Sequence, residues 1–343
     1  MLRREFIRLS GGAFWFSALN LRAEHHLMSD DPLVVAFDLD SLKGRYTDTQ
    51  DFYIRNHFPV PGNSPSYALR IEGEVEKPQQ LAASDIDRFH EREVGAVLEC
   101  AGDPVSTLAL VSDGRWTGFR LRDVLALAQP KEGIAFAHLF GRDGFSRSVP
   151  MERLLTDGFL ARGLNGRPLP PNHGVPWRAL FPGWYGMDSV KWLERIVVAR
   201  NPLPPVENTY LELRENAAGA VEPSALPRIQ VKSLMTSPVD RAVLHKGSID
   251  VHGVAWSGSG RIAKVDVSND GGASWKGATL DIPGSVYDWT LWRATFDVRQ
   301  TGHFELVCRA ADERGNVQPE RRDPARADQY VYNVCHRIRC VVT

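Results

Sequence analysis

The sequence predicts an α+β protein of two domains, a mixed helix-and-strand domain followed by an all-β sandwich. Three observations support this prediction. The chain has 343 residues, of which 43% are hydrophobic, enough for two separate cores. Strand-like and short helix-like segments alternate as far as about residue 200. From about Arg228 onward, short alternating strands bounded by Gly, Asn or Asp recur, a pattern typical of an immunoglobulin-like sandwich.

The first 23 residues are predicted to be an export signal. Arg3 and Arg4 form a twin-arginine pattern, which a weakly apolar stretch over residues 11–21 follows. This stretch is about half as long as a bilayer-spanning helix, so we expect no stable membrane span. An amphipathic N-terminal helix is the alternative. Twin-arginine export carries folded proteins, and it therefore predicts a periplasmic location.

The mixed domain is expected over residues 45–212. Residues 24–50 are predicted to form a polar strap across the surface, and residues 201–223 a linker rich in proline. The segment 163–185 is rich in Pro, Gly and Trp, and so much irregular chain suggests that it lines a site. Strands are predicted at 67–76, 94–99, 134–140 and 189–199, and helices at 84–90, 121–128 and 149–155.

The sandwich is expected over residues 225–343. Its predicted strands are 248–256, 262–270, 290–298 and 303–312, where apolar and polar residues alternate. The run Ser268-Asn269-Asp270-Gly271-Gly272 predicts a hairpin turn.

Composition excludes several classes of protein. A net charge of −1 provides no basic surface for nucleic acid. The four cysteines form no CxxC pair and no zinc-ligand spacing, and without CxxCH no c-type haem is attached to this chain. Cys335 and Cys340 are five residues apart in a strand-like run, which places them on opposite faces. We therefore expect free thiols.

Three ordered motifs indicate the chemistry: YIRNHFPVP at 53–61, VLECAGDP at 97–104, and LNGRPLPPNHGVPWRALFPGWYGMDSVKWL at 164–193. Cys100 alone would be interpreted as a small buried hydrophobe. Together the motifs resemble the sulfite oxidase family of molybdopterin-dependent oxidoreductases, in its exported, haem-free bacterial form. Residues 253–275 resemble the family's dimerisation domain, so a homodimer is expected.

The resemblance implies a molybdenum–molybdopterin cofactor whose metal is ligated by the Cys100 thiolate, a soft ligand suited to this metal. Cationic donors at matched positions suit the cofactor's phosphate and pterin oxygens. For the histidines a purely structural role is the alternative, for Lys191 a solvated strand face, and for Asp143 a generic turn. The implied cofactor contacts are Tyr53, Ile54, Arg55, Asn56, His57, Asp143, His173, Arg178, Ser189, Val190 and Lys191.

The implied catalytic residues are Arg55, Cys100 and Tyr210. Arg55 would bind an oxyanion, because a guanidinium is permanently charged and can grip two oxygens. Tyr210 is either the family's active-site tyrosine or a linker aromatic packed between the domains. The sequence departs from the family at Asp103, where Asn is usual, and in residues 104–114, which carry neither the second substrate arginine nor its neighbouring tryptophan. The third pocket arginine has no clear match.

The leading hypothesis is an enzyme that oxidises sulfite to sulfate by oxygen-atom transfer at molybdenum and passes electrons to an external cytochrome c. The missing arginines leave other substrates open. Alternatives on the same cofactor are an S-oxide or N-oxide reductase and a dehydrogenase of another sulfur compound. A non-catalytic extracellular binding module is the alternative from a different class.

Overall fold

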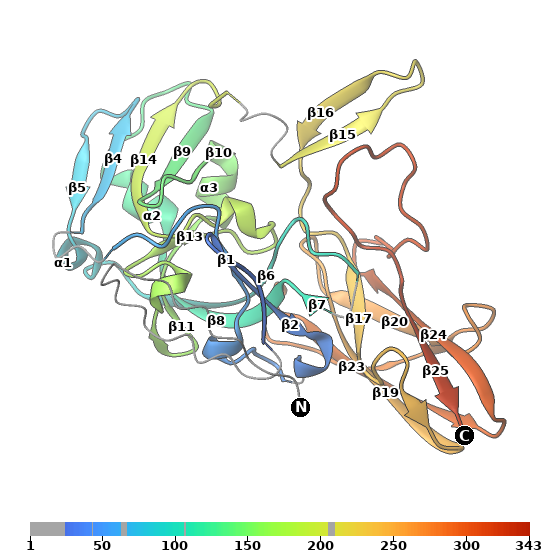
Figure 1. Ribbon diagram of the computed structural model, residues 1–343. Coiled ribbons are helices and arrows are strands. Elements are labelled where there is room, and N and C mark those ends of the chain that lie inside the picture. The colour runs from blue at the N-terminus through green and yellow to red at the C-terminus, as the bar shows by residue number, and fades with distance from the viewer. Residues whose placement is uncertain (1–24, 43, 63–66, 106–107, 205–209) are drawn as a thin grey trace, which may run out of the picture.

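The computed structural model describes residues 25–42, 44–62, 67–105, 108–204 and 210–343 (Figure 1). The predicted export signal at 1–23 lies outside these residues. The chain forms an N-terminal part of three sheets with short helices and a C-terminal part of two sheets, joined side by side (Figure 1). Among the described residues, no helix is long and apolar enough to cross a membrane.

The first sheet corrects the expected surface strap. β1 (His25–Asp30) and β2 (Leu33–Asp38) form an antiparallel hairpin, and β3 (Ile54–Arg55) and β7 (Leu108–Ala109) pair with β2. Val35 and Phe37 are each 1% exposed, because the run LVVAFD turns alternate apolar side chains into the core. The pairing of β3 with β2 fixes the strand on which Arg55 lies.

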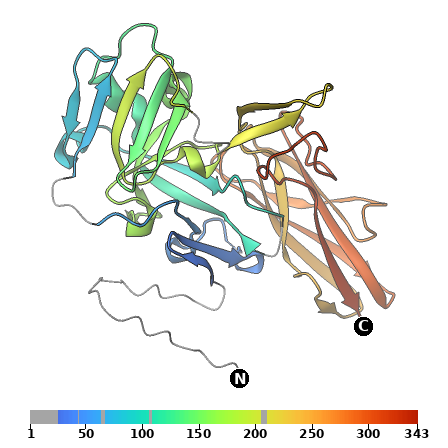
Figure 2. The same cartoon turned by 45° about the horizontal axis from the view of Figure 1, so that its top comes forward.

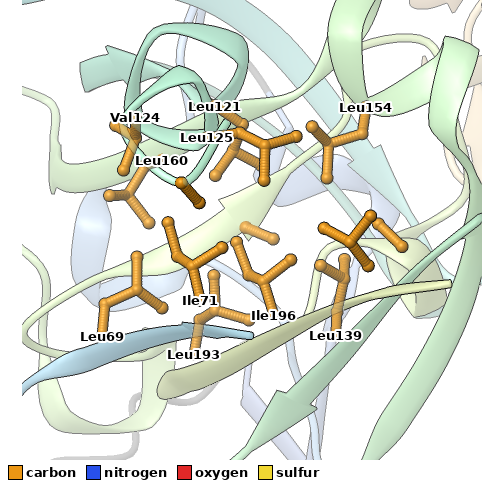
Figure 3. Close-up of a cluster of buried hydrophobic side chains, with 14 of the residues drawn as sticks. Leu69, Ile71, Leu121, Val124, Leu125, Leu139, Leu154, Leu160, Leu193 and Ile196 are labelled. Atoms are coloured by element: carbon orange, nitrogen blue, oxygen red, sulfur yellow. The ribbon is translucent and has the colours of Figure 1, made fainter. Parts of the chain in front are cut away.

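The second sheet carries the main core of the N-terminal part. Its strand order is β10-β9-β14-β4-β5, and helices α2 and α3 pack on it. Figure 3 shows Leu69, Ile71, Leu139 and Ile196 of the sheet facing side chains from the helices. The bounds are β4 (Leu69–Gly73), β5 (Gln79–Leu81), β9 (Phe136–Gly141), β10 (Ser146–Pro150), β14 (Leu193–Ala199), α2 (Leu121–Ala126) and α3 (Met151–Asp157).

The third sheet leads the chain to Cys100. Its order is β12-β11-β8-β6, with β13 beside β11, and β6 ends at Glu99. The predicted strand 94–99 is confirmed as β6, and short 3-10 helices occupy part of the irregular segment. The bounds are β6 (Arg92–Glu99), β8 (Val111–Arg120), β11 (Phe159–Leu164), β12 (Arg167–Pro168), β13 (Arg178–Leu180), η1 (Leu39–Ser41), η2 (Thr49–Asp51), η3 (Pro171–His173) and η4 (Gly186–Asp188).

Three further predictions need correction. The helix expected at 84–90 is the single turn α1 (Ala83–Ile86), where Asp85 accepts a hydrogen bond from the Ala82 N–H. The strand expected from 189 begins at Leu193, because Trp192 has φ +50° and interrupts the extended chain. The proposed linker contains a hairpin, β15 (Leu211–Glu215) with β16 (Val221–Ala225), which lies beside the boundary between the two parts (Figure 1, Figure 2).

The C-terminal part is the expected β-sandwich. One sheet has the order β17-β19-β23-β22 and the other β18-β25-β24-β20-β21. Their facing side chains form one core that includes Val251, Trp292 and Leu306. The bounds are β17 (Lys232–Ser237), β18 (Val243–Leu244), β19 (Gly247–Trp256), β20 (Ile262–Ser268), β21 (Lys276–Gly277), β22 (Thr279–Asp281), β23 (Thr290–Val298), β24 (Gly302–Asp312) and β25 (His336–Val342).

A shared hydrophobic cluster joins the two parts. Val97 and Tyr185 of the N-terminal part pack in it with Trp256 and Trp289 of the C-terminal part, and both tryptophans are at most 1% exposed. The end of β6 therefore lies against the sandwich rather than in solvent. All four cysteines are free thiols.

Candidate active site

One cavity collects side chains from all three sequence motifs. It lies where β3, the end of β6 and the segment before β14 meet. Every sequence-predicted site residue except Ile54 lines it: Tyr53, Arg55, Asn56, His57, Cys100, Asp143, His173, Arg178, Ser189, Val190, Lys191 and Tyr210. Ile54 faces a neighbouring open cleft of about 800 Å³, because successive residues of a strand point to opposite sides.

Cys100 is half-buried at the point where β6 ends. Its N–H donates to the Leu110 carbonyl at 2.9 Å, and its carbonyl accepts from the Asp103 N–H at 2.9 Å. Burial raises the pKa of the Cys100 thiol to about 11. The free side chain is therefore a protonated thiol at neutral pH, and the thiolate requires a cation or a metal beside it.

Two cations, the buried Arg178 and the half-buried Lys191, face the cavity without an ion-pair partner among the described residues. The Arg178 guanidinium donates to the Ser189 carbonyl at 2.7 Å, and the Lys191 ammonium donates to the Asn172 carbonyl at 3.0 Å and to the Asn56 side-chain oxygen. Burial lowers the pKa of Arg178 to about 10 and, with repulsion from Arg178, holds that of Lys191 well below its usual range. Buried charges are costly unless paired, so this arrangement fits an anionic ligand.

Polar groups around these cations fit the same ligand. The Asn56 amide nitrogen is buried and has no hydrogen-bond partner among the described residues. His173 is 5% exposed, and burial followed by repulsion from Lys191 holds its pKa well below the usual range, so the ring is neutral. Asp143 lines the cavity and also accepts a bond from the Phe145 N–H at 3.1 Å, so it both shapes the turn and faces the site.

His57 and Tyr210 form a neutral pair on another wall. The Tyr210 hydroxyl hydrogen-bonds His57 Nε2, and the His57 ring stacks on Phe145 with centroids 4.6 Å apart. Burial, followed by the charge of Arg55, lowers the pKa of His57 to about 4. Burial raises the pKa of Tyr210 above its ordinary value. Both groups are therefore uncharged at neutral pH. Tyr210 also packs in the hydrophobic cluster that joins the two parts, as the linker alternative expected, so its position fits both predicted roles.

Arg147 and Tyr330 are site neighbours that sequence reasoning missed. The Arg147 guanidinium carbon lies 5.4 Å from the centre of the Tyr210 ring, whose other neighbour, Tyr330, stacks at 5.3 Å. Arg147 pairs with the buried Asp188 at 3.2 Å, a carboxylate that Arg153 also contacts. The alternation of Asp143, Phe145 and Arg147 in GRDGFSR could have indicated Arg147. No local signal points to Tyr330.

Comparisons with known proteins agree across almost the whole described chain. Residues 57–206 match the oxidoreductase molybdopterin binding domain, and residues 224–342 match the Mo-co oxidoreductase dimerisation domain.

Sulfite oxidase of Gallus gallus is 36% identical over 316 residues, covering 81% of this chain and 69% of the relative. The Arabidopsis thaliana sulfite oxidase is 31% identical over 328 residues, covering 78% of this chain and 81% of the relative. The Homo sapiens mitochondrial sulfite oxidase is 33% identical over 338 residues, covering 85% of this chain and 61% of its own length, less than two thirds.

A solved structure, that of the sulfane dehydrogenase SoxCD from Paracoccus pantotrophus, superimposes with a TM-score of 0.84. The sequences are 28% identical, and the match covers 96% of this chain and 92% of that one. The likeness of fold therefore extends through both parts of the chain.

Proposed function

Because this chain belongs to the sulfite oxidase family of molybdopterin-dependent oxidoreductases, we propose that it oxidises sulfite to sulfate and passes the electrons to an external cytochrome c. Family membership makes it an oxidoreductase, so a non-catalytic binding module is not retained. The observation that carries the proposal is the buried Arg178 beside the half-buried Lys191, in the cavity that Cys100 also lines; neither cation has an ion-pair partner in the part of the chain that the structure describes.

These residues fit a molybdenum–molybdopterin cofactor. Cys100 would ligate the metal through its sulfur, while Arg178, Lys191 and His173 would hold the phosphate and pterin oxygens. The Asn56 amide nitrogen, for which the described segments provide no hydrogen-bond partner, would donate to the cofactor as well. When bound, this group supplies two-electron oxygen-atom exchange with the substrate.

Arg55 would bind the substrate oxyanion. Its guanidinium lines the cavity beside Cys100 and donates to the Asn56 carbonyl, which fixes its direction. Arg147 adds positive charge on the Tyr210 side of the cavity. Its partner Asp188 carries one negative charge and also pairs with Arg153, so the charge of Arg147 is neutralised only in part. We propose that Arg147 partly replaces the second substrate arginine, which residues 104–114 lack.

The neutral pair His57 and Tyr210 would orient the substrate. Both side chains can donate or accept hydrogen bonds at a substrate oxygen without adding charge. Stacking on Phe145 restricts the His57 ring, so the hydroxyl of Tyr210 has a defined direction.

A dehydrogenase of another sulfur compound is the second candidate. The short loop at 104–114 and the likeness to a sulfane dehydrogenase support this candidate as an alternative to sulfite. Reduction of an S-oxide or N-oxide is a further reaction that the same cofactor could support, but no particular residue of the site favours it.

Three further features belong to the proposal. The Arg3-Arg4 pattern supports export to the periplasm through a twin-arginine signal. The match to a dimerisation domain supports a homodimer formed through the sandwich. The two sheets of the sandwich, antiparallel except for the parallel pair β18–β25, support an immunoglobulin-like topology.

The test is molybdenum content together with a substrate panel on purified, exported protein. We expect about one molybdenum per chain and sulfite-dependent reduction of cytochrome c. Thiosulfate with cytochrome c, and dimethyl sulfoxide with a reduced dye, test the other candidates. Molybdenum without sulfite turnover would remove sulfite but keep the cofactor, whereas protein without molybdenum or pterin would contradict the whole proposal.

A further inference from the structure

A buried cation from the C-terminal part sits between the two carboxylates that flank Cys100. Lys232, the first residue of β17, is 0% exposed, and its ammonium lies 3.0 Å from Glu99 Oε1 and 2.7 Å from Asp103 Oδ2. Trp256 Nε1 donates to the second oxygen of Glu99 at 2.8 Å. Each carboxylate is at most 3% exposed, so all three charges depend on one another.

Asp103 connects this cluster to the backbone that holds Cys100. One oxygen of Asp103 accepts from the Leu110 N–H at 2.6 Å, while the Leu110 carbonyl accepts from the Cys100 N–H at 2.9 Å. The other oxygen accepts from Lys232. We call residues 100–103 the Cys100 loop. One oxygen of Asp103 therefore binds the backbone of Leu110, which in turn binds Cys100, and the other oxygen attaches the loop to Lys232 of the sandwich.

The need for both bonds explains why Asp103 stands where Asn would be expected. An Asn side chain could still accept from the Leu110 N–H through its oxygen. Its NH₂ group would then face the Lys232 ammonium, and two donors would meet in a buried space. Asp103 and Lys232 are thus a matched pair.

A second contact attaches the same loop to the sandwich. The Val331 N–H donates to the Ala101 carbonyl at 2.8 Å, directly after Cys100. We infer that Lys232 is a positioning residue for Cys100: through Glu99 and Asp103 it lets the C-terminal part fix the direction of the metal-ligating sulfur. The inference rests on the proposed role of Cys100, and it gives the sandwich a role at the active site beyond dimerisation.

Another contact between the two parts provides a matched control. Arg228 pairs with Asp157 of α3 at 2.6 Å and makes no contact with the Cys100 loop that the structure records. Arg228→Met therefore removes an ion pair across the same boundary, and leaves Cys100, Glu99 and Asp103 untouched.

The experiment compares Lys232→Met and Arg228→Met with the wild type in the full chain. Two quantities are measured: molybdenum per chain in the purified enzyme, and the rate at which iodoacetamide alkylates Cys100 in cofactor-free protein, followed by peptide mass spectrometry. We expect Lys232→Met to lower molybdenum content by about tenfold or more. Release of the Cys100 sulfur from its fixed direction should raise the alkylation rate, while the unpaired Glu99 and Asp103 carboxylates act against that rise by raising the pKa of the thiol. Arg228→Met should leave both near the wild-type values. The alkylation rate needs no cofactor, so it tests the inference even if the proposed function fails.

A neutral variant covers the case in which Lys232→Met does not fold. The triple substitution Lys232→Met, Glu99→Gln and Asp103→Asn removes all three buried charges, so folding should recover. Its Cys100 should still react faster than in Arg228→Met, because the bond between Asp103 of the loop and Lys232 of the sandwich is gone. Cys100 alkylation and molybdenum content equal to those of Arg228→Met, in whichever variant folds, would overturn the inference.

Discussion

The Tyr210 hydroxyl and the His57 imidazole form a hydrogen bond between residues 153 positions apart in the chain. His57 belongs to the first sequence motif, whereas Tyr210 comes just before the β15–β16 hairpin. The bond therefore closes the cavity from the side of the segment that joins the two parts. The Tyr210 ring also lies beside Arg147 and Tyr330.

Arg55→Gln should raise the KM for sulfite by about one to two decades. Loss of a charged, bidentate contact at a partly buried site corresponds to roughly 1.5–3 kcal/mol. Arg55→Lys should restore only part of the affinity, because an ammonium cannot reproduce the guanidinium fork. Steady-state kinetics with cytochrome c as acceptor measure both variants. Unchanged sulfite kinetics in Arg55→Gln would exclude Arg55 from the substrate site.

Arg147→Gln should raise the same KM less, by about threefold to tenfold, because Asp188 already offsets part of its charge. Arg153→Gln is the control, since it loses a bond to the same carboxylate but lies over Trp184 rather than Tyr210. Equal effects of the two substitutions on KM would mean that Arg147 acts only through Asp188.

The sequence motifs predicted the contents of the cavity well, because each motif holds several site residues within a few positions. Asn56 and His57 directly follow β3, so a short strand and its continuation place them together. Arg147 was missed although alternation from Asp143 carries the signal. Lys232 and Trp256 could not be predicted, because they meet Glu99 only once two separately folded cores have packed together.

The fold was predicted where alternation was regular and missed where it was short. The four strands expected in the sandwich correspond to β19, β20, β23 and β24, although β20 ends at Ser268, two residues earlier than expected. The β1–β2 hairpin was missed, because the apolar run LVVAF in β2 is short and acidic residues stand on both sides of it. The β15–β16 hairpin was missed, because no core packs on β16, which is exposed throughout.

Asp113→Asn should make stability less dependent on pH. Burial, followed by repulsion from Asp288, holds the pKa of Asp113 well above its usual range, and burial also raises that of Asp288. The native state then keeps a proton that the unfolded chain releases above about pH 4, so stability falls as pH rises from there toward the native pKa.

The amide introduced by Asp113→Asn can replace both contacts of the protonated carboxyl. Its oxygen can accept from the Trp289 N–H, as the carboxyl of Asp113 does now at 2.9 Å, and its NH₂ group can donate to Asp288. Urea unfolding between about pH 5 and pH 8 should therefore show a smaller loss of stability in this variant than in the wild type. Asp297→Asn, at an exposed ion pair with Arg299, is the control. Parallel pH profiles for wild type and Asp113→Asn would contradict the raised pKa of Asp113 in the native state.

The purified protein should sediment as a homodimer at micromolar concentration, through the part that matches a dimerisation domain. Sedimentation velocity over a dilution series measures this directly. A strict monomer throughout the series would contradict dimerisation.

The central claim is that Cys100 ligates molybdenum in this cavity, and X-ray absorption at the molybdenum edge tests it most directly. Cys100→Ser should keep its fold and much of its pterin but lose turnover, because a neutral hydroxyl is a poor replacement for a soft thiolate. The spectrum of the wild type should fit one more sulfur ligand than that of Cys100→Ser. The same sulfur coordination in both proteins, or no molybdenum in the wild type, would contradict the account.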